Sequence, residues 1–314
     1  DTASAGGGNV IAAPGNTATF TAVFLLPGFL SFEAWNNIGG TAVAGLLNDP
    51  RYPDSPTLKT YASSFNTRTV YPDDSHENYG GRLEGLLVPA ETADYDLFLR
   101  SDDASQLFIS TDDTPDNLSL VAEETGCCAA FQEPGAGETT ATPIRLEAGK
   151  RYFVRAIWKE GGGGDYAQVA WRKTDDTTAA SSLSPIPGQF LMTIIADPNA
   201  GPPVVTKSPT VPNVALGGNA SLGPVEVGIG EKPITFQWQF GKRINQFSNI
   251  SGATGDTLSV ANVGLNNVGF YRVNVTNAKG SASSQTVLLA PSGTLFIEAE
   301  DFNFDGGQSV AAAS

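Results

Sequence analysis

The stretch RYFVRAIWKEGGGGDYAQVAWR, residues 151–172, carries the strongest structural signal in the sequence. In its first part every second side chain is apolar or aromatic, which predicts a strand with one buried face. The side chains on that face are Tyr152, Val154, Ala156 and Trp158. Four glycines then interrupt the pattern, and an alternating run resumes at residues 167–172. We therefore expect two strands joined by a glycine loop.

Similar strand patterns occur elsewhere in the chain. Further strand signals lie at residues 82–88, 95–100 and 106–110. The 314 residues include 35 glycines and 20 prolines, which punctuate the sequence at short intervals, as is typical of many short strands joined by turns. No stretch of about twelve or more residues holds a clean helical apolar stripe. The sequence thus predicts an all-β protein.

Charge is sparse and strongly acidic. The chain has 18 Lys and Arg against 33 Asp and Glu, which gives a net charge of −15. A nucleic-acid backbone would be repelled by this surface, so no nucleic acid is expected as a partner. No apolar run approaches the ~20 residues of a membrane span. Acidic composition suits a secreted or cell-surface protein, and clustered carboxylates suit calcium, although solubility alone explains most of the acids.

Composition divides the chain into five parts. They are an N-terminal segment with one strand signal at Asn16–Phe24 (1–28), a first domain (29–196), a Pro/Gly linker (197–203), a second domain (204–290) and the start of a further β module (291–314). Because the chain begins at Asp1 and the last part holds only one strand signal, we interpret it as a fragment of a longer polypeptide.

The second domain contains a half-buried strand around Trp238 and another around Tyr271. Tyr271 stands two residues before Val273, at the position where many sandwich domains have their second cysteine. On these residues the segment resembles the bacterial immunoglobulin-like domains that lack the disulfide. The resemblance implies a β-sandwich that acts as a spacer.

Carboxylates and glycines gather at two strand ends of the first domain. Asp102 and Asp103 follow the strand that begins at residue 95, and Asp165 follows the four glycines. Calcium prefers several oxygen ligands at short range, and glycines let the backbone approach with its carbonyl groups turned inward. We expect a metal site made by Asp102, Asp103, Asp165, Gly163 and Gly164. The alternative is that these acids are solvated turn residues.

At these positions the first domain resembles the PA-fourteen family, the β-barrel first described in the anthrax protective antigen. The matching stretches are WNNIGG (35–40), LNDPRYP (47–53), NYG (78–80), SDD (101–103) and LEAGKRYFVRAIWKEGGGGDYAQVAW (146–171). The resemblance implies a barrel of two packed antiparallel sheets. It also implies a cis peptide bond between Asp102 and Asp103, and calcium-dependent sugar binding as in fungal and bacterial adhesins of the family.

The two cysteines, Cys127 and Cys128, are adjacent. They either form a vicinal disulfide that stiffens a binding loop, or remain two thiols, one of which could pair between chains. The loop at residues 126–137, with Cys127, Cys128 and Phe131, is the expected ligand-selecting loop. Many relatives lack adjacent cysteines there, so the identity of the sugar cannot be carried over.

Catalytic signals are weak. The single histidine, His76, cannot build a multi-imidazole zinc site, and no nucleophile elbow or phosphate loop is present. The sequence therefore predicts a non-enzyme, with any catalytic domain lying elsewhere in a larger protein. The last residues, around Glu298 and Glu300, resemble the first strand of a jelly-roll carbohydrate-binding module.

The leading hypothesis is a calcium-dependent carbohydrate-binding module of a large extracellular, bacterial, adhesin-like protein, with glycans or cell-surface polysaccharide as its partner. Two alternatives stay open. The domains could be rigid spacers in a surface or fibre protein, in which calcium only stiffens the barrel. They could also contact protein neighbours, including further copies of themselves, through strand edges or through the loop at residues 126–137.

Overall fold

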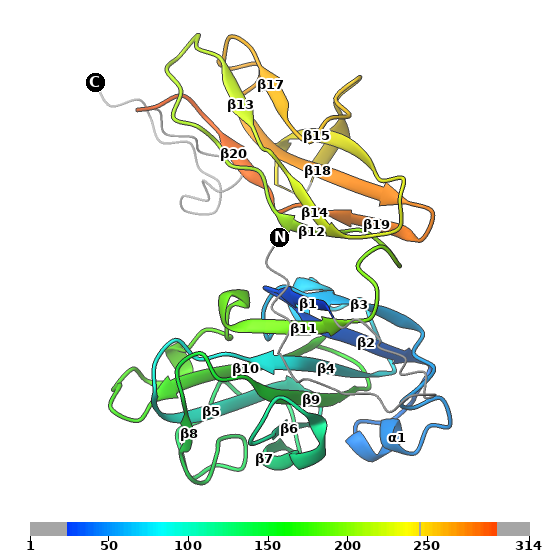
Figure 1. Cartoon of the computed structure of the whole chain (residues 1–314), viewed down its shortest axis with the longest axis vertical. Coiled ribbons are helices and arrows are strands. Elements are labelled where there is room, and N and C mark those ends of the chain that lie inside the picture. The colour runs from blue at the N-terminus through cyan, green and yellow to red at the C-terminus, as the bar shows by residue number, and fades with distance from the viewer. Residues whose placement is uncertain (1–23, 245, 294–314) are drawn as a thin grey trace, which may run out of the picture.

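The computed structural model describes residues 24–244 and 246–293, and this part of the chain is built almost entirely from β-strands (Figure 1). The predicted all-β class is confirmed. Helical structure in the described residues comprises α1 (Val43–Leu47) and the 3-10 turns η1 (Thr67–Thr69), η2 (Pro115–Asn117), η3 (Ala180–Ser182) and η4 (Gly188–Phe190). Among these residues, no helix has both the length and the apolar character needed to cross a bilayer.

The first unit contains an eight-stranded antiparallel sheet. Its main path runs β1-β11-β4-β9-β6-β7, and β2 pairs with both β3 and β4. The strands are β1 (Phe24–Pro27), β2 (Leu30–Asn36), β3 (Leu58–Ala62), β4 (Tyr79–Leu87), β6 (Ser105–Ile109), β7 (Ser119–Glu124), β9 (Tyr152–Glu160) and β11 (Leu191–Ile195). Strand β1 adds to the edge of the sheet by pairing with β11, although the sequence placed residues 24–27 in the N-terminal segment.

A three-stranded antiparallel sheet faces the first one. Its order is β10-β5-β8, and its strands are β5 (Ala93–Asp102), β8 (Ile144–Leu146) and β10 (Tyr166–Lys173). Strands β9 and β10 are the two strands expected from residues 151–172, but they belong to different sheets. The glycine loop between them therefore crosses from one sheet to the other and joins the two layers at one end of the barrel.

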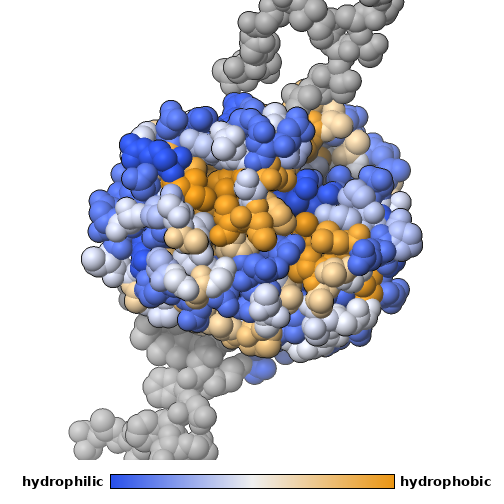
Figure 2. Space-filling model, turned by 90° about the horizontal axis from the view of Figure 1, so that it is seen from below, coloured by the Kyte–Doolittle hydropathy of each residue, from blue (hydrophilic) through white to orange (hydrophobic). Residues whose placement is uncertain are grey.

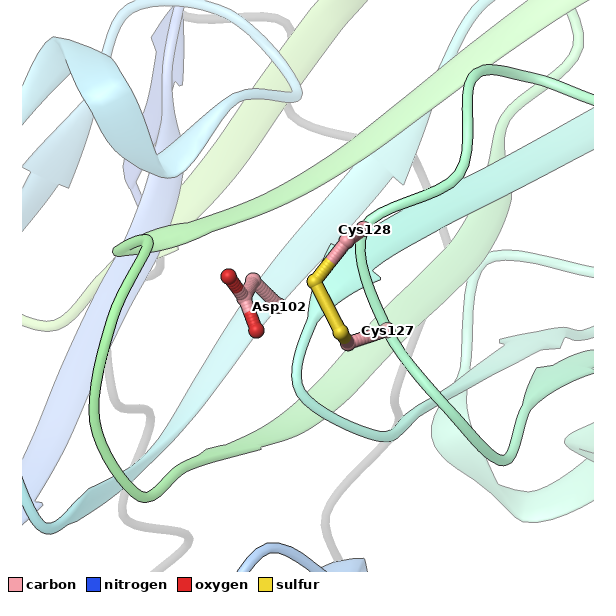
Figure 3. A group of neighbouring side chains, drawn as sticks. All are labelled: Asp102, Cys127 and Cys128. Atoms are coloured by element: carbon pink, nitrogen blue, oxygen red, sulfur yellow. A yellow bond between two sulfur atoms is a disulfide. The ribbon is translucent and has the colours of Figure 1, made fainter.

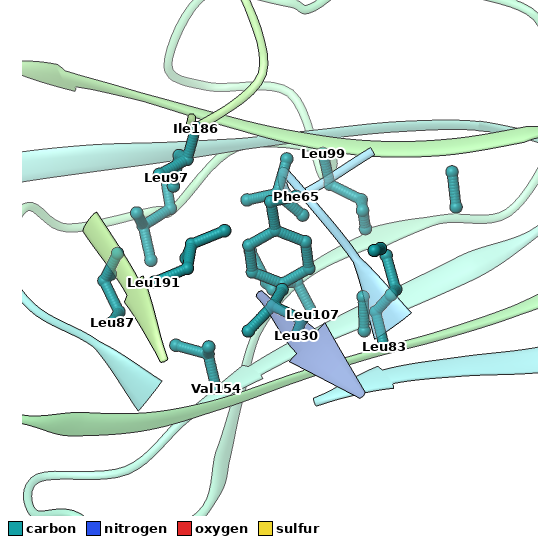
Figure 4. Close-up of a cluster of buried hydrophobic side chains, with 14 of the residues drawn as sticks. Leu30, Phe65, Leu83, Leu87, Leu97, Leu99, Leu107, Val154, Ile186 and Leu191 are labelled. Carbon is teal, nitrogen blue, oxygen red and sulfur yellow. The ribbon is translucent and has the colours of Figure 1, made fainter. Parts of the chain in front are cut away.

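The main core lies between these two sheets (Figure 4). The predicted face of β9 is confirmed, since all four of its side chains belong to this core. Leu99 and Val169 contribute from the opposite sheet, and Phe65 from the loop beyond β3. Trp158 is fully buried, and its indole N–H donates to the hydroxyl of Tyr79 at 3.1 Å.

The other face of β9 is largely buried as well, which alternation alone does not predict. A second apolar cluster contains Trp35 from β2, Leu46 from α1 and Ile157 from β9. Helix α1 therefore covers the outside of the large sheet where β9 runs. Figure 2 views the end of this unit that lies away from the second unit, and it shows apolar patches bordered by polar residues.

The second unit has its own core around the fully buried Trp238. Its sheets are β12-β14, β13-β17 and a five-stranded sheet of order β16-β15-β18-β19, in which β20 pairs with β18. The strands are β12 (Val204–Lys207), β13 (Ala220–Leu222), β14 (Glu226–Ile229), β15 (Thr235–Arg243), β16 (Gln246–Asn249), β17 (Leu258–Val260), β18 (Gly269–Asn277), β19 (Gly280–Ser283) and β20 (Val287–Leu289).

Two side chains hold the centre of this unit. The indole N–H of Trp238 on β15 donates to the carbonyl of Gly255 at 2.9 Å. The hydroxyl of Tyr271 on β18 donates to the carbonyl of Asn267 at 2.6 Å, a bond back to the chain four residues upstream. Both features accompany the immunoglobulin-like sandwich. That assignment stays an interpretation of the sequence.

A small apolar cluster lies at the junction of the two units. Leu26 and Ile195 from the first unit pack with Val204 and Ile229 from the second. Most of the predicted strand at residues 16–24 lies outside the described residues. So do residues 294–314, which contain the resemblance to a jelly-roll module.

Candidate metal centre

Asp102 and Asp103 lie where β5 ends, beside the start of β6. The peptide bond between them is cis, the geometry that the family resemblance implies. The backbone N–H of Asp103 donates to the carbonyl of Lys159 on β9 at 2.9 Å. The hydroxyl groups of Ser101 and Ser105 lie 2.6 Å apart, and that of Ser101 also donates to the carbonyl of Asp103. These bonds tie the aspartate pair to both neighbouring strands.

A third carboxylate, Glu160, meets the pair from the end of β9. One carboxylate oxygen from each of Asp102, Asp103 and Glu160 lies within 4.8 Å of the other two. Glu160 is fully buried, and neither of its carboxylate oxygens has a hydrogen-bond partner among the described residues. The neighbouring Lys159 does not supply one, because its ammonium group donates to the backbone carbonyl of Glu160 at 2.5 Å.

Burial and like charge perturb these acids. Burial first, and then repulsion from Asp103 and Asp102, raises the pKa of Glu160 to about 8. Burial is also the main cause that raises the pKa of Asp102 above its usual range, and the charge of Asp103 adds to it. A buried carboxylate without donors is costly, and close carboxylates disfavour one another's charge. A cation would remove both penalties.

The glycine loop approaches the carboxylates, but with its N–H groups. Gly161 donates to Asp103 Oδ2 at 3.0 Å, and Gly164 donates to Asp102 Oδ2 at 2.9 Å. Gly163 donates to Glu77 Oε2 at 3.2 Å. The bonds that the structure shows for Gly163 and Gly164 are thus N–H donations, and their carbonyl groups as metal ligands stay a prediction. The glycines are nonetheless needed, since a Cβ on Gly164 would lie 2.6 Å from Asp102 Oδ2.

Asp165 does not join Asp102 and Asp103 as the third carboxylate. Its side chain is fully buried, and Oδ2 accepts the backbone N–H of His76 at 2.6 Å. The N–H of Asp165 donates to Asp74 Oδ1 at 3.0 Å. Asp165 therefore fastens residues 74–76 to the glycine loop. Asp165 Oδ1, like both oxygens of Glu160, is buried without a hydrogen-bond partner among the described residues, so Asp165 as a metal ligand stays a prediction. Glu160, which forms the three-carboxylate group with Asp102 and Asp103, was not among the predicted ligands, although it directly precedes the four glycines.

Cys127 and Cys128 form a disulfide beside this centre (Figure 3). Both residues are exposed, and their sulfur atoms and a carboxylate oxygen of Asp102 lie within 4.8 Å of one another. The backbone N–H of Cys128 donates to the carbonyl of Ser101 at 2.9 Å. Since both sulfurs are engaged in the bond, neither cysteine offers a free thiol.

Phe131, the third residue expected to face a ligand, points into the protein. Its side chain is 3% exposed and packs with Phe98, Ala170 and Ala180. The guanidinium carbon of Arg100 lies 4.9 Å from the centre of its ring. Phe131 therefore anchors the loop at residues 126–137, and the disulfide is the part of that loop that faces solvent near Asp102.

The donor set fits calcium better than zinc. The converging groups are carboxylate oxygens, which hard cations such as Ca²⁺ prefer, whereas zinc sites in proteins favour histidine and thiolate. His76 stacks on Tyr71, with 3.6 Å between the ring centres. Asp102, Asp103 and Glu160 therefore offer the class of donor atom that calcium prefers.

No family model matches the chain. Two curated proteins match part of it. A mouse N-acetyl-beta-glucosaminyl-glycoprotein 4-beta-N-acetylgalactosaminyltransferase 1 is 29% identical over 146 residues, which is 45% of this chain and 13% of that protein. Endoglucanase C of Cellulomonas fimi is 34% identical over 94 residues, 30% of this chain and 8% of that protein. The chain thus spans only a small part of either relative.

Solved structures with a similar arrangement include adhesin domains. The Epithelial Adhesin 9 A domain of Candida glabrata, solved in complex with Galb1-3GlcNAc, is 12% identical with a TM-score of 0.37, over 56% of this chain and 93% of that domain. The PA14 domain of the MpAFP antifreeze protein is 14% identical with a TM-score of 0.38, over 57% and 95%. Likeness at these values is too distant to assign function.

Proposed function

We propose that the first unit is a carbohydrate-binding module in which Asp102, Asp103 and Glu160 hold Ca²⁺. The observation that carries the proposal is the convergence of three carboxylates on one small volume, with both oxygens of Glu160 buried and unpartnered among the described residues. Such a group needs a cation or protons. Bound calcium would offer coordination positions to sugar hydroxyl groups.

The contacts around the three carboxylates suggest a role for each neighbouring group. The N–H groups of Gly161 and Gly164 orient the carboxylates of Asp103 and Asp102. Glu160 is fully buried and supplies negative charge from the protein side of the centre. Gly162 and Gly163 are exposed, as is the disulfide, so a ligand can approach between the glycine loop and Cys127–Cys128. This exposure supports binding of an external ligand.

The charge of the chain narrows the class of glycan. With a net charge of −15, the protein repels polyanions at long range. Neutral oligosaccharides or neutral surface polysaccharide are therefore the proposed partners. The disulfide supports an oxidising, extracellular setting. The multi-domain bacterial parent and self-association through neighbouring modules remain parts of this proposal.

Calorimetry with calcium tests the ion site. We expect the wild type to bind Ca²⁺, and the Asp102→Asn/Asp103→Asn variant to lose binding. Glu147→Gln, which changes an exposed glutamate, is the matched control and should bind as the wild type does. A wild type that binds no calcium would overturn the ion site.

An array of neutral oligosaccharides, probed with calcium and with chelator, tests the ligand. Glycans retained only with calcium support the proposal. Calcium binding without retention of any glycan supports the second candidate, a structural spacer stiffened by the ion. The complete burial of Glu160 favours that alternative, since neutralising its charge stabilises the fold whether or not a ligand is present.

A further inference from the structure

We propose that the Cys127–Cys128 disulfide forms the apolar wall of the ligand site, and that its reduction weakens glycan binding while calcium stays bound. This inference rests on the proposed function and names the group that contacts the sugar. The position of the disulfide supports this role. The sulfur atoms lie within 4.8 Å of a carboxylate oxygen of Asp102, and Figure 3 shows the S–S bond turned toward that carboxylate.

The disulfide is unsuited to hold the ion itself. Calcium selects oxygen ligands, and a disulfide carries neither charge nor a hard donor atom. Its closeness to Asp102 therefore needs another explanation. Both cysteines are exposed, so the S–S unit presents a small apolar surface to solvent at the edge of the carboxylate cluster. Such a surface suits the C–H face of a sugar whose hydroxyl groups point toward the cluster.

The other groups around the carboxylates are polar or already contact neighbouring side chains. The glycine loop presents backbone N–H groups to Asp102 and Asp103. Tyr166, which pairs with Asp102 across the sheet, has the guanidinium carbons of Arg68 and Arg100 5.7 and 5.5 Å from its ring centre. Among these groups the disulfide is the apolar surface left free for a ligand.

The backbone holds the disulfide in register with the site. Cys128 has a φ of +74°, in the left-handed region that non-glycine residues seldom adopt. Its N–H bonds to the carbonyl of Ser101, the residue before Asp102, and Gly126 donates to Glu124 Oε1 at 2.7 Å. A free dithiol would let Cys128 return to the ordinary region, which would move the wall away from Asp102.

Reduction is a balanced exchange with two molecules of an external thiol. The S–S bond breaks, Cys127 and Cys128 each gain a proton and become thiols, and the two external sulfurs join in a new disulfide. The protein gains two electrons and the external thiols lose two. The carboxylates of Asp102, Asp103 and Glu160 take no part, so the ion site keeps its ligands.

The test compares the wild type, the wild type reduced with glutathione, and the Cys127→Ser/Cys128→Ser variant. Calorimetry measures calcium affinity and the affinity for the neutral oligosaccharide that the wild type retains most strongly on the array. We expect glycan affinity to fall at least about tenfold in the reduced and variant proteins, as for a lost well-packed contact. Calcium affinity should stay within about twofold, and reoxidation should restore glycan binding.

The outcomes separate this inference from the proposed function. Wild type that binds no glycan in calcium overturns both. Wild type that binds, with unchanged glycan affinity after reduction and in the variant, overturns the disulfide wall and leaves the proposed function intact. Loss of calcium binding together with glycan binding also overturns it, because the loop would then support the ion site as a whole.

Discussion

Without calcium, stability should fall as the pH rises, and Glu160 should be the main cause. Its pKa is raised from the ordinary 4.5 to about 8 in the folded protein, by burial and by the charges of Asp103 and Asp102. Between these values the folded state keeps a proton that the unfolded state has lost. The free energy of unfolding therefore decreases with pH through this window, and it levels off on either side.

The two pKa values set the magnitude. Each pKa unit is worth about 1.4 kcal/mol, so the difference between 4.5 and about 8 gives an upper bound of ~5 kcal/mol. The glycine loop beside the cluster contains exposed residues, and its movement would admit water to the charged form. We therefore expect a loss of about 2 kcal/mol between pH 4.5 and pH 8.

Urea unfolding at a series of pH values, in chelator, measures this loss. Glu160→Gln imitates the protonated side chain, so its stability should change less over the same window. Glu147→Gln should follow the wild type. Calcium binding expels the proton from Glu160, so added calcium should stabilise the wild type more at pH 8 than at pH 5. Parallel pH profiles for Glu160→Gln and the wild type would refute the reasoning.

Two further substitutions test the loop and the second core. Gly164→Ala places a Cβ 2.6 Å from Asp102 Oδ2 and should lower calcium affinity by about tenfold or more in calorimetry. Gly39→Ala, whose Cβ would meet nothing closer than 4.0 Å, is the control. Equal calcium affinities for the two variants would contradict this expectation. Trp238→Ala empties the fully buried centre of the second unit and should lower the free energy of unfolding of that unit by about 3–5 kcal/mol, measured in urea. A decrease under about 1 kcal/mol would show that its core does not depend on Trp238.

Part of the site was readable from the sequence because its residues are consecutive. Asp102 and Asp103 follow one strand directly, and the glycine run marks a loop that must approach another group closely. The adjacency of Cys127 and Cys128 likewise limited their pairing to a few possibilities. Residues this close along the chain are brought together by local geometry, so sequence spacing is informative about them.

Sequence spacing could not decide between Glu160 and Asp165 as the carboxylate that meets Asp102 and Asp103. They flank the same four glycines, one at the end of β9 and one directly before β10. Strand pairing brings both near the aspartate pair, since Tyr166 of β10 lies opposite Asp102. The side-chain contacts separate them, because the carboxylate of Glu160 meets those of Asp102 and Asp103 while Asp165 Oδ2 accepts the N–H of His76, a residue far away in the sequence. Phe131 is a similar case, since its burial depends on Phe98 and Ala180 from distant parts of the chain.

The sequence by itself determined the all-β class, the alternating face of residues 152–158 and the gathering of acids and glycines at strand ends. These follow from backbone periodicity and from residue types that act over a few positions. The tertiary structure alone decided that β9 is buried on both faces, that Glu160 completes the carboxylate cluster and that the disulfide stands beside Asp102. Each depends on contacts between segments far apart in sequence, and the energy of such contacts is set by burial and charge in the folded chain.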